Sequence, residues 1–281
     1  MATHSYQWRF AAPHAGDSFV GAKLRFFFDI GIFFVLLQQF GGKPPRVNND
    51  GNMNITIIAN GLFPEGEWVD GILQQSDRIV CCDGALEKYL EWKRRRAFAG
   101  NDKSITVIGD GDSLREGVVE QATALGVEVK RVRVAEQDDN DLTKATRHVL
   151  GDCGGEPLQP IEVNYIGATG LREDHTLGNI SLLAWYMEQF PGVQFRMLSD
   201  YGIMVPMKGH AVFNSHPGQQ VSLFSLTPNT PVTTKGLRWL IKERCLEWWW
   251  EGTLNEALGQ QVEVWGGKMV VYLLTGESPI A

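Results

Sequence analysis

Cysteine is scarce in this chain, with four residues among 281. Cys81 and Cys82 are adjacent, whereas Cys153 and Cys245 stand far away, so the spacing matches neither a disulfide framework nor a zinc site. Cys81 and Cys82 lie in an apolar run, which favours core residues over nucleophiles. This usage is typical of reduced thiols, and we expect a cytoplasmic protein.

Positive charge is also in short supply. Lys and Arg number 26 against 33 Asp and Glu, which gives a net charge of -7. Because proteins that bind nucleic acid generally present a basic surface, we expect no nucleic-acid partner. An acidic protein that handles phosphates must gather a few basic residues locally or recruit metal ions.

No apolar run is long enough to cross a membrane. The longest, residues 26–37, is interrupted by Asp29 and Gly31 and is shorter than the roughly 20 residues that a spanning helix needs. The residues that follow it offer no small-x-small cleavage site of the kind that ends a signal peptide. We therefore expect no membrane partner, and we interpret residues 1–52 as an extension outside the globular fold, with Met53 as the natural start.

Residues 53–200 alternate short apolar runs with helical patterns, which predicts an α/β domain with a mostly parallel, doubly wound sheet. We expect strands at 55–59, 78–82, 105–108, 128–132, 163–166 and 195–198, and helices at 85–97, 114–125, 142–150 and 176–189. Several strands end in polar or glycine-containing loops. Ligands of open α/β sheets bind beyond the carboxyl ends of the strands, so a site is expected there.

Residues 201–281 have a different pattern, with short alternating segments separated by turn residues. They predict an antiparallel β-sandwich domain with strands at 202–207, 211–214, 220–226, 236–240, 261–265 and 269–274. Trp248, Trp249 and Trp250 cannot all face one core if they form a strand. At least one of them is expected to cover an interface or a ring-shaped ligand, with an irregular buried loop as the alternative.

Two aspartates follow one of the apolar strands. Asp110 and Asp112 are two residues apart and would emerge on the same side of an extended chain, with Gly111 between them. Paired carboxylates repel each other unless a cation lies between them, which indicates a Mg²⁺ site at a strand end. The same residues are also good turn composition, so a simple turn is the alternative.

A second acidic stretch, residues 137–144, holds three acids, two amides and a lysine at a loop-to-helix junction. Asp141 could complete the metal shell, with Lys144 neutralising a phosphate from one turn into the helix. An N-cap is the structural alternative for Asp141.

A glycine-bearing turn, residues 167–176, stands between another strand and its helix. Backbone N–H groups at a helix start suit an anion, and Arg172 adds a planar fork for phosphate. His175 could act as a general base or as a hydrogen-bonding scaffold.

In order and spacing, these segments resemble the motifs of the thiamine pyrophosphokinase (thiamine diphosphokinase) family. The residues that carry the resemblance are Asp83-Gly84-Ala85, Gly109 to Ser113, Gln137-Asp138-x-x-Asp141-x-x-Lys144, Gly170-x-Arg172-x-Asp174-His175-x-x-x-Asn179, Gly236 to Trp239 and Gly252 to Glu256. Leu171 stands where the family usually has a glycine, and Leu254 where it usually has a serine.

The resemblance implies transfer of the β,γ-diphosphate of ATP to the hydroxyl of thiamine, giving thiamine diphosphate and AMP. It implies Asp110, Asp112 and Asp141 as Mg²⁺ ligands with Asp83 nearby as a further catalytic residue. Nucleotide binding would fall to Gln137, Lys144 and Arg172, and thiamine binding to Asp174, Trp239 and Asn255. It also implies a homodimer whose pocket lies at the subunit interface.

Two other functions remain open from the sequence. A haloacid-dehalogenase-type phosphatase shares a Gly-Asp-Gly motif but needs an Asp-x-Asp nucleophile at the end of the first strand, where this chain has Asn60-Gly61-Leu62. A non-catalytic nucleotide or thiamine sensor would keep the pocket without turnover, although binding alone hardly needs so many acids.

Overall fold

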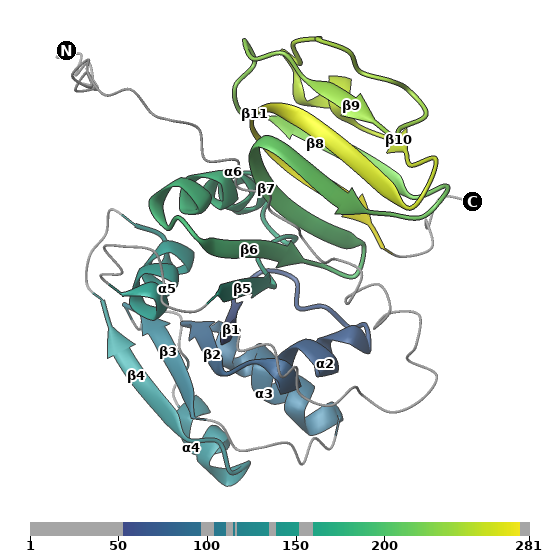
Figure 1. The fold of residues 1–281 in the computed structure, drawn as a ribbon. Helices are drawn as coiled ribbons and strands as arrows, with labels where there is room; N and C mark the ends of the chain where they lie inside the picture. The colour runs from purple at the N-terminus through teal and green to yellow at the C-terminus, as the bar shows by residue number, and fades with distance from the viewer. Residues whose placement is uncertain are drawn as a thin grey trace, which may run out of the picture.

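The computed structural model describes residues 53–96, 104–110, 115, 117–134, 139–151 and 160–275. Six strands form a parallel sheet in the order β6-β5-β1-β2-β3-β4 (Figure 1). Their bounds are β1 Met53–Ile58, β2 Arg78–Cys82, β3 Ile105–Gly109, β4 Val129–Arg133, β5 Ile161–Ile166 and β6 Val193–Leu198. The six strands predicted within residues 53–200 all exist, with ends that differ by at most two residues.

In the described part of the chain, five helices cover the two faces of this sheet. They are α2 Trp68–Gln75, α3 Ala85–Arg95, α4 Val118–Ala124, α5 Asp141–Leu150 and α6 Glu173–Gln189. Apolar residues of α2, α3 and α4 share one buried cluster, and those of α5 and α6 share the other. Helices therefore pack on both faces, as expected for a doubly wound sheet. Among the described residues, no helix is long and apolar enough to cross a membrane.

The direction of winding reverses between β1 and β5. From β1 the chain adds β2, β3 and β4 outward on one side, then returns to place β5 and β6 on the other side of β1. Right-handed crossovers in opposite directions put the connecting helices on opposite faces, which explains the two helix layers. Such a switch point leaves a crevice beyond the carboxyl ends of its two strands.

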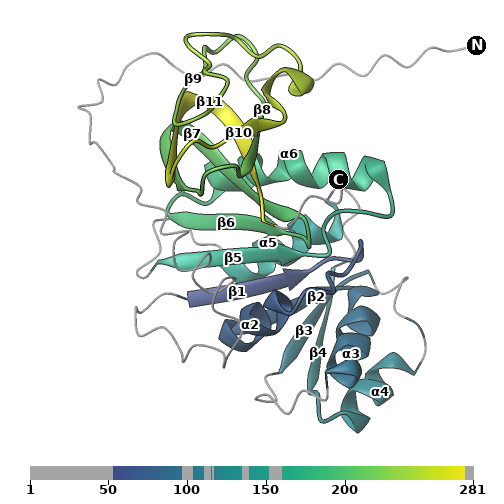
Figure 2. The same ribbon diagram turned by 90° about the vertical axis from the view of Figure 1, so that its right-hand side faces the viewer.

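The C-terminal region is antiparallel and joins the same sheet. Its strands are β7 Gly202–Asn214, β8 Gln220–Ser225, β9 Thr233–Lys235, β10 Asn255–Glu256 and β11 Gln261–Leu274, with a 3₁₀ turn η1 at Trp249–Gly252. Strand β7 pairs with β6 at two positions only, Met197 with Met204 and Leu198 with Ile203. Figure 2 shows these strands stacked beyond β6, at one end of the parallel sheet.

Strands β7 and β11 pair along nearly their whole length, with a register shift between Gly266 and Met269. Before the shift β11 pairs with β9, and after it with β8. Gly209, on the facing strand, has a φ of +80°, which glycine adopts without strain. Apolar residues of both halves belong to the same buried cluster as those of α2, α3 and α4, so the core continues from the parallel sheet into the antiparallel region.

Several sequence-based boundaries in this region were wrong. Segments 202–207 and 211–214 form one strand, as do 261–265 and 269–274, because backbone pairing continues through the bend. The strand predicted at 236–240 does not form, since only Leu237 makes an isolated bridge, to Ala257. Trp248 to Trp250 do not form a strand, because a 3₁₀ turn begins at Trp249. Trp249 packs on Phe224, while Trp248 and Trp250 are exposed.

The two adjacent cysteines are core residues, as predicted. Cys81 and Cys82 are free and buried in β2, on opposite faces of the sheet. Burial raises the pKa of the Cys81 thiol far above its ordinary value of 9.0, because the thiolate has no water around it. Burial, followed by the negative charge of Asp141, raises the pKa of Cys82 in the same direction.

The raised pKa of Cys81 predicts a loss of stability in alkali. The unfolded thiol ionises as the pH passes about 9 while the folded thiol stays neutral, so the free energy of unfolding falls with rising pH. Replacing Cys81 with alanine should flatten this fall by up to about 1.4 kcal/mol per pH unit above that range. Urea unfolding at pH 7 to 10.5 measures both slopes. Parallel slopes for Cys81→Ala and wild type would contradict the assignment.

Candidate active site

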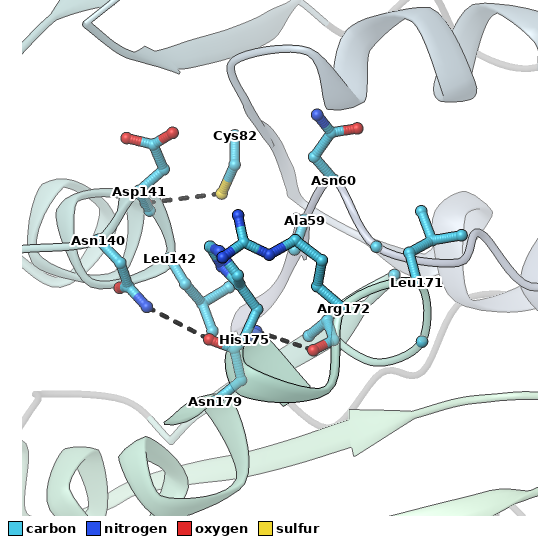
Figure 3. Close-up of a pocket in the computed structure, with 14 residues that line it drawn as sticks. Ala59, Asn60, Cys82, Asn140, Asp141, Leu142, Leu171, Arg172, His175 and Asn179 are labelled. Atoms are coloured by element: carbon cyan, nitrogen blue, oxygen red, sulfur yellow. Dashed lines mark hydrogen bonds between the residues drawn. The ribbon is translucent and has the colours of Figure 1, made fainter. Parts of the chain in front are cut away.

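A cavity of about 370 Å³ lies at the switch point, beyond the ends of β1 and β5 (Figure 3). One wall comes from the loop after β1, another from the loop between β5 and α6, and a third from the start of α5. The lining residues are Ala59, Asn60, Gly61, Cys82, Asn140, Asp141, Leu142, Gly167, Ala168, Gly170, Leu171, Arg172, His175 and Asn179. The site therefore forms where the winding of the sheet predicts a crevice.

Glycines let the loops after β1 and β5 approach each other closely. The Gly61 N–H donates to Gly167 O at 2.6 Å, and the Leu62 N–H donates to Thr169 O at 2.8 Å. A Cβ on Gly61 would lie 2.5 Å from the backbone oxygens of both Gly167 and Thr169. Gly167, with a φ of +63°, would place a Cβ 2.6 Å from Ala59 O. Side chains are therefore sterically excluded at this junction.

A lysine from α3 supports the same junction. The Lys88 ammonium donates to Asn60 O at 2.6 Å and also to Gly61 O. Partial burial lowers the pKa of Lys88, because the charged form loses hydration. Lys88 thus ties the loop after β1 to helix α3.

Three of the predicted acidic residues lie around the end of β2. Asp83 is buried, has a φ of +37° and donates its N–H to Ile108 O at 2.8 Å. A Cβ on Gly109 would touch Asp83 Cβ at 2.7 Å, so Asp83 packs against the residue that precedes Asp110. The negative charges of Asp141 and Asp83 both help to raise the pKa of the Cys82 thiol. The carboxylates of Asp83 and Asp141 therefore flank the same point.

Asn140 rather than Asp141 caps helix α5. The Asn140 side chain accepts from the Thr143 N–H at 2.9 Å, which leaves the Asp141 carboxylate in the first turn without a capping duty. Lys144 Nζ lies 3.3 Å from Asp141 Oδ1, and its side chain is 5% exposed against 36% for Asp141. A buried ammonium beside a half-exposed carboxylate suits a site that binds phosphate and a cation together.

Asn179 joins two walls of the pocket and was absent from the predicted site residues. Its Nδ2 donates to Ala168 O at 2.8 Å, and its Oδ1 accepts from Asn140 Nδ2 at 3.2 Å. This buried amide therefore fixes the loop after β5 to the cap of α5. Asn60, Asn140 and Cys82 were missed as well. Only their positions in the sequence could have indicated a role in the site, since each lies at a strand end or a helix start.

Arg172 and Asp174 form an exposed ion pair at the start of α6. Arg172 donates from Nε to Asp174 Oδ1 at 3.1 Å and from Nη2 to Oδ2 at 2.5 Å. The hydrogen bonds from Arg172 lower the pKa of Asp174, and the His175 N–H contributes further. Arg172 lines the pocket and Asp174 does not, so Asp174 orients the guanidinium in this structure.

His175 also lines the pocket, and its side chain is exposed. Its ring makes no hydrogen bond with the part of the chain that the structure describes. A scaffold role for the ring is therefore not seen, and the general-base role stays a prediction.

Leu171 has a φ of +66° and a side chain that is 68% exposed. The left-handed conformation costs a leucine about 1–2 kcal/mol relative to the right-handed one. Leu254, the other departure from the family motifs, also has a positive φ, of +58°. Both leucines thus occupy backbone positions that suit glycine or a small polar residue better.

Trp239 and Asn255 lie in the antiparallel region and do not line the pocket. Asn255 is buried, accepts from the Trp239 N–H at 3.1 Å and donates to Trp239 O at 2.7 Å. Its side chain thereby holds the backbone of Trp239, whose own side chain is 57% exposed. Of the predicted thiamine residues, Asp174 pairs with Arg172 from the predicted nucleotide set, whereas Trp239 and Asn255 lie apart from the pocket within this one chain.

Asp112 and Gln137 lie outside the described residues, so the metal set cannot be assembled in full. Among the residues that are described, no group of three or more His, Cys, Asp or Glu side chains could hold a metal ion. Asp110 and Asp141 still fit an open Mg²⁺ site in chemistry, because Mg²⁺ takes one or two carboxylates, several waters and substrate phosphates.

The glycine junction generates a prediction. Gly61→Ala should destabilise the protein by about 1–3 kcal/mol, because its Cβ meets two backbone oxygens that cannot move independently. Gly178→Ala is the matched control, since it lies within α6 with open space around it and should stabilise the helix by up to about 1 kcal/mol. Thermal unfolding measures both, and a Gly61→Ala variant as stable as wild type would show that the loops can separate freely.

Two family models match the chain in succession. Residues 69–195 match the model described as thiamin pyrophosphokinase, catalytic domain, and residues 202–272 match thiamin pyrophosphokinase, substrate-binding domain. Thiamine pyrophosphokinase 1 of Oryza sativa subsp. japonica is 28% identical over 209 residues, covering 70% of this chain and 76% of the relative. Thiamine pyrophosphokinase 1 of Arabidopsis thaliana is 29% identical with the same coverage.

Solved structures agree in fold. Thiamin pyrophosphokinase from Candida albicans superposes with a TM-score of 0.66 at 17% identity, covering 84% of this chain and 95% of that one. Thiamine pyrophosphokinase from Bacillus subtilis has a TM-score of 0.60 at 19% identity, covering 79% and 99%. The fold class predicted from the sequence is thus confirmed. Because the two family models together match well over half of its residues, the chain belongs to the thiamin pyrophosphokinase family.

Proposed function

We propose that this chain is an ATP-dependent diphosphotransferase that converts thiamine and ATP into thiamine diphosphate and AMP. The observation that carries the proposal is the pocket at the switch point. It combines the Asp141 carboxylate, the Arg172 guanidinium and the exposed backbone of glycine residues at the strand ends. The family membership and the names of the curated relatives support the same activity.

In the proposed reaction the thiamine hydroxyl oxygen bonds to the β-phosphorus of ATP. The bond from that phosphorus to the oxygen bridging it to the α-phosphorus breaks, AMP leaves, and the hydroxyl proton passes to solvent or to a nearby base. Such a transfer depends mainly on alignment and on spreading the charge of the phosphoryl group. Asp112, Asp174 and His175 are the candidates for a weak base.

We assign the charged walls of the pocket to the two ends of the polyphosphate. Asp110, Asp112 and Asp141 are proposed to hold Mg²⁺, which when bound would neutralise phosphate oxygens. Asp83, which packs against Gly109, is proposed as a further carboxylate beside them. Lys144, Arg172 and Gln137 are proposed to hold the nucleotide. The Lys144–Asp141 pair supports this, because Asp141 lines the pocket and the buried Lys144 ammonium lies 3.3 Å from its carboxylate.

We propose that thiamine binds with help from a second copy of the chain. Trp239, Trp248 and Trp250 are large apolar side chains left exposed in the antiparallel region. A tryptophan face can stack on a cationic heterocycle such as thiamine. A homodimer that brings this region to the partner's pocket would place Trp239 and Asn255 near the predicted nucleotide residues. Reduced thiols at Cys81 and Cys82 accord with a cytoplasmic enzyme.

The two rival functions are less well supported. A dehalogenase-type phosphatase needs an aspartate nucleophile at the end of β1, and Asn60 lines the pocket there. A sensor needs no strained, buried carboxylate such as Asp83. Incubation with ATP, Mg²⁺ and thiamine separates all three: AMP with thiamine diphosphate supports the proposal, phosphate release supports the phosphatase, and binding without AMP supports the sensor.

Asp112→Asn tests the metal assignment. The variant should lose AMP formation by a factor on the order of 100 or more, because an amide cannot balance the charge of a metal and its phosphates. Its melting temperature should stay nearly unchanged. Glu120→Gln, an exposed carboxylate on α4, is the matched control and should keep the wild-type rate. Wild-type turnover in Asp112→Asn would refute the assignment.

Trp239→Ala tests the thiamine assignment separately. The side chain is largely exposed, so its loss should leave the melting temperature nearly unchanged. The KM for thiamine should rise about 5- to 30-fold, in line with about 1–2 kcal/mol for a ring that stacks on a cation, while the KM for ATP stays the same. An unchanged KM for thiamine would remove Trp239 from the site.

A further inference from the structure

Two exposed leucines stand at one edge of the pocket, apart from its charged groups. Leu171 lines the pocket, and Leu62 lies against the same loop, since a Cβ on Gly170 would be 2.7 Å from Leu62 Cβ. Their side chains are 68% and 54% exposed. Figure 3 shows Leu171 and Asp141 on opposite sides of the pocket, with Arg172 between them.

This arrangement gives the pocket two ends of different chemistry. Asp141, which pairs with Lys144, marks the charged end, and Arg172 lies in the middle. Leu171 forms the apolar end, with Leu62 beside its loop. A ligand that fits both ends carries phosphate, or the group that receives it, on one side and an apolar ring on the other. Both ATP and thiamine have this form in the proposed reaction.

The fold itself gains nothing from a leucine at position 171. The side chain is exposed, and the φ of +66° disfavours any residue with a Cβ. Strained residues that persist in a pocket wall are most simply explained by a contact made when the pocket is filled. The departure from glycine is a property of this chain rather than of its family's motif.

We propose that Leu171 contacts the heterocyclic ring of a bound substrate and that it is a specificity-determining residue of this site. The inference rests on the proposed function, because it takes the ligand to be a ring joined to phosphate or to a phosphate acceptor. The ring is either the adenine of ATP or one of the thiamine rings, and the two sources are distinguished by separate titrations.

The test compares Leu171→Ala and Leu171→Gly with wild type by calorimetric titration of ATP, thiamine and inorganic tripolyphosphate. Loss of the leucine side chain should weaken binding of one ring-bearing ligand about 3- to 10-fold, the scale expected for part of a leucine surface. Tripolyphosphate has no ring, so its affinity should not change. Leu177→Ala, an exposed leucine on α6 outside the pocket lining, is the matched control and should bind all three as wild type does.

Thermal unfolding separates contact from strain. Alanine keeps the Cβ that is disfavoured at this φ and glycine removes it, so Leu171→Gly should melt higher than Leu171→Ala. Both variants should nevertheless lose the same ring-dependent affinity. The ligand whose affinity falls identifies the ring.

Several outcomes overturn the proposal. Unchanged affinities for ATP and thiamine in both variants refute the contact, and an equal loss for tripolyphosphate shows that Leu171 acts through the shape of the loop instead. Neither result touches the proposed function. A wild-type protein that binds neither ATP nor thiamine refutes the proposed function, and the contact with it.

Discussion

The close approach of two strand-end loops is the constraint on which the candidate site depends. Gly61, Gly167 and Gly170 let the backbone after β1 meet the backbone after β5, so that hydrogen bonds join loops that are about 100 residues apart in sequence. The switch point supplies the crevice, but the glycines set its width. Lys88 and Asn179 then fix the two sides, each by bonds to backbone carbonyl oxygens.

The same constraint reaches the antiparallel region through Asp200, which follows β6. Its carboxylate accepts from the Glu65 and Gly66 N–H groups and from Trp68 Nε1, at 2.7 to 3.1 Å. The loop after β1 is thus held at one end by β5 and at the other by the turn that leads into β7. Because β7 also pairs with β6, the antiparallel strands are attached to the scaffold that shapes the pocket. We therefore expect a substitution in this turn to change the structure of both the pocket and the antiparallel region.

Most of the fold was predictable because the parallel strands are buried runs that end at polar or glycine residues. Helix α2 was missed although Val69, Ile72 and Leu73 form its buried face, because eight residues give a weak period. Strands β7 and β11 were each divided in two, since the alternation stops at an exposed bend while the pairing continues. The strand expected at 236–240 does not form. Its apolar residues Trp239 and Leu240, which suggested a buried strand, are exposed.

Charge indicated where to look for the pocket. Asp141 and Arg172, two residues chosen from the sequence, line it, because charged residues at helix starts beyond a sheet edge have few structural roles. Asn179 and Asn140 could not be chosen in this way, because an amide gains its role from a distant carbonyl or amide that the sequence does not locate. Leu171 could not be singled out for its proposed contact with a ligand either, because its positive φ is seen only in the structure.

The placement of charge explains how an acidic chain can bind an anionic substrate. The protein carries a net charge of -7, so a polyphosphate approaching at long range meets repulsion that salt screens only in part. At short range Lys144 and Arg172 offer cations, but Asp141 and Asp174 already pair with them. Free phosphate alone should therefore bind weakly. In the proposed site, a divalent cation held by Asp110, Asp112 and Asp141 would leave Lys144 to the phosphates, whereas Arg172 would still be shared with Asp174. On this argument the acidic residues would require the metal and the nucleotide to bind together.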